Sequence, residues 1–167
     1  MPFGKRVLRS DVAYSVWANH RLLAACSSLA AEQLALALRL SHAGILATLR
    51  HIYDGERVWL LCLRDTPAMG RYILPPGPAP ELSLDALRQR WPNLWDGFRQ
   101  WLEAQSEEDL EAEIFVQLPD GRPQLPRWKI LRHVLAHSNF HRGQIVGMIR
   151  SLGQPPPAIN STDYFLS

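Results

Sequence analysis

Cysteine is scarce in this sequence, and so are net charge and long apolar runs. The two cysteines, Cys26 and Cys62, form no CxxC motif, which excludes a disulfide framework. The formal net charge is +2, from 18 Lys+Arg against 16 Asp+Glu, and gives no electrostatic footprint for nucleic acid or anionic membranes. No apolar run reaches the roughly 18 residues of a membrane span, and no signal-peptide core follows the N-terminus. These absences predict a cytoplasmic protein with reduced thiols that binds neither nucleic acid nor membrane.

Apolar residues are plentiful enough for a packed core. They make up 47% of the 167 residues, against 20% charged residues, and we expect one domain spanning residues 1–167. Helical patterns predict four long helices, at about 10–29, 41–63, 83–104 and 127–152. Ser83 can cap the third helix, and Gly153, followed by three prolines, can end the fourth. Pro92 should kink or break the third helix.

Two segments depart from the helical pattern. The prolines between residues 65 and 80 predict a long loop. Residues 111–118 alternate and are rich in β-formers, and Pro119-Asp120-Gly121 is a turn signature, so a short hairpin is expected there. The fold class is therefore all-α, a four-helix bundle with a long Pro-rich loop and a short β-hairpin before the last helix. A three-helix core with a β appendage is the alternative.

Aromatic residues recur along the third predicted helix and near the C-terminus. We assign the helical set to the core rather than to a cofactor site: Trp91, Trp95, Phe98 and Trp101. The C-terminal set is expected to pack against the rest of the protein: Tyr164, Phe165 and Leu166.

Half of the six histidines lie on the last predicted helix, at steps of four residues. Each step rotates by about 40° around a helix, so His133, His137 and His141 form a stripe, and two imidazoles at this spacing can point at one ion. On a helical wheel His141 and His137 lie nearest the apolar direction, where a buried imidazole needs a partner. We interpret these two as metal ligands, the alternative being polar residues that recur without function.

A third ligand has to come from another helix. Five residues are candidates: His20, His42, His51, Asp54 and Glu56. Gly44, Thr48 and Gly55 leave space beside His51, although periodicity alone fits an exposed or core-edge histidine equally well.

The segment 133–145 (HVLAHSNFHRGQI) resembles the signature of the DinB family of damage-inducible proteins. Segments 14–23, 49–59 and 153–166 also resemble the family, in the same order, so the resemblance covers nearly the whole chain. Asn160-Ser161, where a more acidic tail is expected, and the loop 75–80 depart from the family pattern.

The resemblance implies a four-helix bundle, often dimeric, with a divalent metal. Nickel or zinc is expected, and imidazole ligands suit these metals better than magnesium or calcium. The six tryptophans, many for one bundle core, also favour a homodimer. Carried over to this sequence, the ligands are a histidine triad: His51, His137 and His141.

The resemblance also suggests residues that support the site. Asn19 and Glu56 would lie near it, orienting a ligand, whereas a helix-interface amide and a salt-bridged carboxylate are the alternatives. Gln144 would also support a metal ligand without binding the metal itself. His133 would either pack within the fold or support a ligand in the same way. Arg142 is expected to be structural.

By resemblance, the fold is shared with metal-dependent enzymes that use low-molecular-weight thiols, including S-transferases and a maleylpyruvate isomerase. Three neutral imidazoles leave a divalent ion its full charge, which lowers the pKa of a bound thiol. Cys62 is the one conceivable protein thiol, and we assign it to the core. The first hypothesis is a metal-dependent thiol S-transferase or isomerase with a small-molecule thiol and an electrophile. The second is a non-catalytic metal-binding stress-response protein or interaction module; DNA handling is opposed by the balanced charge.

Overall fold

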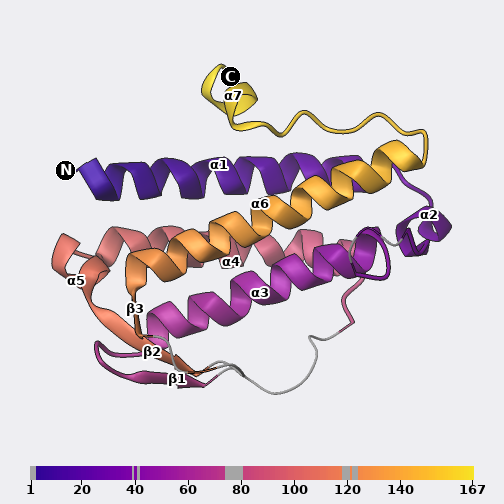
Figure 1. The fold of residues 1–167 in the computed structure, drawn as a ribbon. Helices are drawn as coiled ribbons and strands as arrows, with labels where there is room; N and C mark the ends of the chain where they lie inside the picture. Colours follow the sequence, from indigo (N-terminus) through magenta and orange to yellow (C-terminus); the bar gives the residue numbers. More distant parts are fainter. Residues whose placement is uncertain (1–2, 39, 41, 74–80, 118–120, 122–123) are drawn as a thin grey trace.

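Four long helices form a bundle in the computed structural model, which describes residues 3–38, 40, 42–73, 81–117, 121 and 124–167 (Figure 1). They are α1 (Phe3–Cys26), α3 (Ile45–Asp65), α4 (Leu84–Ala104) and α6 (Arg127–Ser151). Helices α1 and α3 each pack against both α4 and α6, so the four helices surround a common core. The prediction of a four-helix bundle is confirmed.

The third predicted helix, α4, begins where its capping residue predicts. The Ser83 hydroxyl accepts a hydrogen bond from the Ala86 N–H at 3.1 Å, which satisfies a backbone donor of the first turn. The helix then runs through Pro92 without the break that proline could have caused. Its tryptophans Trp91, Trp95 and Trp101 are all buried, as expected for core residues.

Two helix starts differ from the prediction. Helix α1 begins seven residues before residue 10, at Phe3, and ends at Cys26 rather than near 29. Helix α3 begins at Ile45 rather than at 41, because Gly44 occupies the N-cap position. The Gly44 carbonyl accepts two hydrogen bonds from Thr48, one from its backbone N–H at 2.9 Å and one from the Thr48 hydroxyl at 2.8 Å. The chain before it forms a short unpredicted helix, α2 (Ala31–Ala35).

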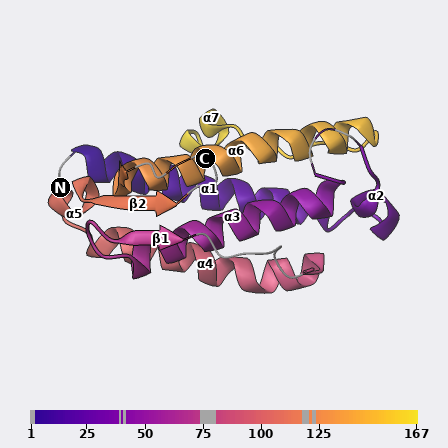
Figure 2. The same ribbon diagram turned by 60° about the horizontal axis from the view of Figure 1, so that its bottom comes forward.

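A small sheet lies at one end of the bundle (Figures 1 and 2). Strands β2 (Glu113–Gln117) and β3 (Gln124–Pro126) pair antiparallel after the short helix α5 (Glu107–Glu111), which confirms the hairpin. Strand β1 (Arg71–Ile73) adds to β2 in parallel and was not predicted, because its segment reads as loop. The prolines at 75–80 and the turn residues 119–120 lie outside the described residues.

The end of the chain is correctly predicted only in part. Gly153 has a φ of 71°, a conformation that favours glycine and ends α6 as expected. The following helix α7 (Ser161–Phe165) packs on α1, with the Tyr164 ring 5.5 Å from that of Trp17. Phe165 and Leu166 stay exposed, so the expectation that they pack down is wrong. Within the described part of the chain, no helix is both long and apolar enough to span a membrane.

Candidate metal centre

The three histidines assigned as ligands are brought together by the packing of α3 against α6. His51 lies in the second turn of α3, and His137 and His141 lie one turn apart in the middle of α6. Their ring centroids are 4.9 Å apart for His51–His137, 4.6 Å for His51–His141 and 4.5 Å for His137–His141. All three imidazoles therefore share one small space between two helices.

The closest approach in this cluster joins two ring nitrogens. The Nε2 atoms of His51 and His137 are 3.0 Å apart. In the structure one ring donates to the other at this distance. Two nitrogens bound to one tetrahedral zinc ion at about 2.0–2.1 Å lie about 3.3 Å from each other, so the pair is within a few tenths of an ångström of the separation that a shared ion requires.

A fourth imidazole, His42, joins the cluster from the connection between α2 and α3. Its ring centroid is 3.8 Å from that of His51 and 5.5 Å from that of His141. One ligand nitrogen from each of these three residues can be chosen so that all lie within 4.8 Å of one another. Among the described residues, this set could hold a metal ion. It shares His51 and His141 with the triad from the sequence and has His42 in place of His137.

Two of the other candidates have partners elsewhere. The His20 ring lies edge-on to Trp95, with centroids 4.4 Å apart. The Asp54 carboxylate accepts hydrogen bonds from Arg57 at 2.7 and 3.0 Å, within α3. Neither residue belongs to the histidine cluster.

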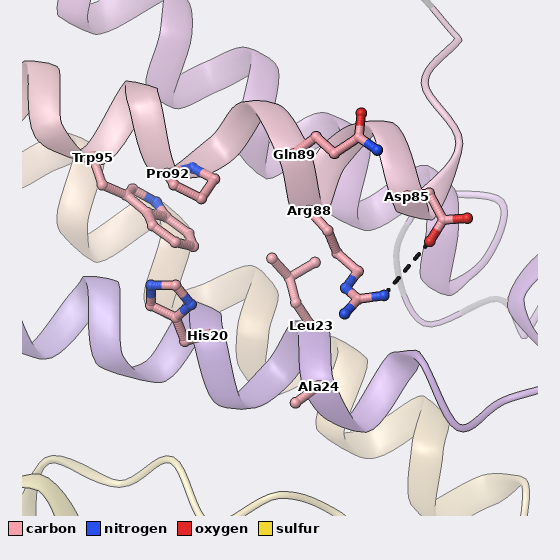
Figure 3. Close-up of a pocket in the computed structure, with 8 residues that line it drawn as sticks. All are labelled: His20, Leu23, Ala24, Asp85, Arg88, Gln89, Pro92 and Trp95. Carbon is pink, nitrogen blue, oxygen red and sulfur yellow. Dashed lines mark ion pairs between the residues drawn. The ribbon is translucent and has the colours of Figure 1, made fainter.

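A cavity of 550 Å³ opens between α1 and α4 and contains His20 in its wall (Figure 3). Leu23 and Trp95 supply apolar surface there, and Arg88 pairs with Asp85 at 3.6 Å. None of the four clustered histidines lines this cavity, so it is separate from the candidate metal centre.

Burial holds the clustered imidazoles in the form that binds metals. Burial, and after it the neighbouring imidazoles, lower the pKa of His51 and of His137 to about 4 each. Burial also lowers the pKa of His42. At neutral pH these rings are uncharged, and a neutral imidazole has a lone pair free to bind a metal.

Gln144 holds the ring of His141 in a defined orientation. Its side-chain carbonyl lies 2.6 Å from His141 Nδ1 and accepts the hydrogen of that nitrogen. The lone pair then lies on Nε2, as is usual where a second partner fixes the tautomer of a ligating histidine. His133 lies at the rim of the cluster, exposed, with its ring 6.0 Å from that of His137.

Gly55 makes room for His137. A Cβ atom at this position would lie only 3.2 Å from His137 Cε1, closer than most real contacts of that atom. The sequence predicts that small residues leave space beside His51, and the structure shows that the His137 ring fills this space.

Asn19 and Glu56, expected near the site, belong to a buried network in the core. The Glu56 carboxylate accepts hydrogen bonds from the Asn19 amide at 3.1 Å, the Ser138 hydroxyl at 2.8 Å and the Trp91 indole at 2.6 Å. Burial raises the pKa of Glu56, while these donors and Arg142 act in the opposite direction. None of the three donors is a histidine.

The guanidinium of Arg142 completes this network. It is 1% exposed and donates hydrogen bonds to the Ser15 hydroxyl at 2.9 Å and the Asn19 side-chain carbonyl at 3.0 Å. Asn19 therefore bridges the buried cation to the buried carboxylate of Glu56. The network ties α1, α3, α4 and α6 together.

The network and the histidine cluster use adjacent residues of α6. Ser138 follows His137 directly, and Arg142 follows His141. Each pair is one residue apart on the same turn of helix, so the buried network and the histidine cluster lie on neighbouring faces of α6.

Fold and site together define a helical bundle with a histidine cluster suited to a metal ion. A sequence model of the DinB family matches residues 5–166, and the chain belongs to this family. The resemblance read from the sequence is thereby confirmed over nearly the whole chain. A comparison with curated proteins gave no match.

Proposed function

We propose that the protein holds one divalent metal ion, nickel or zinc, and uses it in thiol chemistry. The ligands proposed from the sequence are His51, His137 and His141. The observation that carries this proposal is the 3.0 Å separation of the His51 and His137 Nε2 atoms, with His141 beside both rings. An all-imidazole donor set fits zinc or nickel and does not fit magnesium or calcium.

We propose one of two reactions. The protein either joins a low-molecular-weight thiol to an electrophile or uses such a thiol to isomerise an electrophile. A bound divalent ion supplies a Lewis acid that favours the thiolate form of the thiol. The neutral rings of His51 and His137 bind the metal, and Gln144 orients His141. His51 and His137 are only half-buried, so a small molecule can approach them from solvent.

The thiol in this proposal has to come from solution. Both cysteines are buried and free, and burial raises the pKa of Cys26 and of Cys62 to about 12. Neither is a thiolate at neutral pH, so neither can act as the nucleophile. Such reduced thiols fit the cytoplasm, where we propose that the protein acts.

The enzyme proposal predicts that metal-loaded protein accelerates thiol conjugation. Zinc- or nickel-loaded protein should conjugate at least one of a panel of low-molecular-weight thiols to chlorodinitrobenzene faster than the free metal does. The rate should be lost in His51→Ala and kept in His20→Ala, whose histidine lies outside the cluster. A broad panel of thiols and electrophiles with no rate above that of free metal would overturn the enzyme proposal.

Metal sequestration without turnover, as in a stress response, is the second candidate function. The position of His42 beside His51 and His141 favours it. Together with His137, four imidazoles would fill every position of a tetrahedral ion and leave none for substrate. A sequestering protein would bind metal tightly and bind no added thiol.

We also propose that the protein forms a homodimer, as the resemblance implies. The six tryptophans give this little support, because each packs on the protein itself. Three are buried in the core, Trp59 and Trp128 are partly buried against it, and Trp17 packs on α7. The remaining support is a set of large exposed apolar side chains: Leu36, Leu40, Met69, Ile73, Phe140, Phe165 and Leu166. Light scattering at micromolar concentration should give twice the chain mass of 19.0 kDa, and the monomer mass would refute the dimer.

A further inference from the structure

His42 differs from the other clustered histidines in the element that carries it. His51, His137 and His141 stand on two long helices, whereas His42 lies in the connection before α3 and its side chain is exposed. Nitrogens on one tetrahedral ion at about 2.0–2.1 Å lie about 3.3 Å apart. The 4.8 Å limit for His42, His51 and His141 therefore requires at most a shift of about 1.5 Å.

The described part of this connection approaches the rest of the protein at two points. At its end, Gly44 passes so close to the end of α2 that a Cβ atom there would lie 2.6 Å from the Leu36 carbonyl oxygen. Near its middle, Leu40 rests on α6, where a Cβ at Gly147 would meet its Cδ1 at 3.8 Å. The contact at Gly147 lies six residues beyond His141 on the same helix. His42 lies between these two contacts in the sequence, and its ring centroid is 3.8 Å from that of His51.

We propose that His42 is a fourth, exchangeable ligand of the metal that the helical histidines hold. With His42 bound, four imidazoles close a tetrahedral site, and with His42 withdrawn one position is open to an incoming thiol. This inference rests on the proposed metal function and adds how the access of a thiol to the metal is regulated. A thiol has to displace His42, so this residue sets how readily the site accepts substrate.

Cobalt(II) serves as the probe, because its visible spectrum reports coordination number and its near-ultraviolet spectrum reports bound thiolate. The proteins compared are the wild type, His42→Ala and the control His20→Ala, another exposed histidine, outside the cluster. Wild type and His20→Ala should give the intense visible bands of a tetrahedral site. His42→Ala should give weaker bands, as waters in place of the imidazole let the ion reach five or six ligands, and a cobalt affinity lower by about 10-fold or more.

Titration with 2-mercaptoethanol then tests the exchange. His42→Ala should develop the thiolate-to-cobalt band at a thiol concentration about 10-fold lower than wild type, since no imidazole has to leave. Equal spectra, cobalt affinities and thiol midpoints in wild type and His42→Ala, with cobalt binding lost in His51→Ala, would overturn the role of His42 and leave the metal site standing. Failure of wild type to bind cobalt would overturn the metal proposal itself.

Discussion

Substitution of His137 by alanine is expected to abolish the stabilisation of the protein by zinc. An ion that binds only the folded state stabilises it by about 4 kcal/mol at a free concentration 1,000 times its Kd. For a chain of this size that corresponds to a rise in Tm of roughly 8–16 °C. Calorimetry with and without zinc should show such a rise in wild type and little or none in His137→Ala.

His20→Ala is the matched control for this experiment, because its imidazole lies against Trp95 and outside the cluster. It should keep the full zinc-dependent rise in Tm. The proposed ligand role of His137 fails if His137→Ala shows the same rise as the control.

Replacing Glu56 with alanine should lower the free energy of unfolding by about 3–5 kcal/mol, because it leaves a buried cation without its compensating charge. Arg142 would keep only its neutral partners, and the Asn19, Ser138 and Trp91 donors would lose their acceptor. Urea unfolding of the metal-free proteins measures this loss without any contribution from the metal site.

Two further variants define the origin of that effect. Glu56→Gln keeps the shape and one carbonyl acceptor, so its cost should be smaller, about 1–3 kcal/mol. Glu108→Ala removes an exposed carboxylate from α5 and should cost less than about 1 kcal/mol. If Glu56→Ala were no more destabilising than Glu108→Ala, the network would not be holding the helices together.

Local periodicity predicts the bundle and places His137 and His141 on one helix face, whereas His51 joins them in the prediction only through the family resemblance. The sequence does not predict the position of His42, and the reason is the start of α3. A helix from residue 41 would place His42 nine residues before His51, a rotation of about 900°, and so on the opposite face. The helix in fact begins after Gly44, which frees His42 to fold back over the cluster. Ser41 and Gly44 are both acceptable caps, so sequence alone could not choose.

The partners of Glu56 were also beyond prediction from the sequence. Periodicity shows a carboxylate on an apolar face of α3 but does not show what faces it. Asn19, Trp91 and Ser138 come from three other helices, at separations of 37, 35 and 82 residues. Only the packing of α1, α4 and α6 around α3 makes them neighbours.

X-ray absorption of the zinc-loaded protein, combined with elemental analysis, tests the central claim most directly. We expect one zinc ion per chain, with three or four nitrogen neighbours at about 2.0–2.1 Å and the outer-shell scattering of imidazole rings. Loss of this signal in a His51→Ala, His137→Ala, His141→Ala triple variant would assign the ion to the cluster. A wild-type protein that holds no stoichiometric metal after loading, or holds it without imidazole neighbours, would contradict the account.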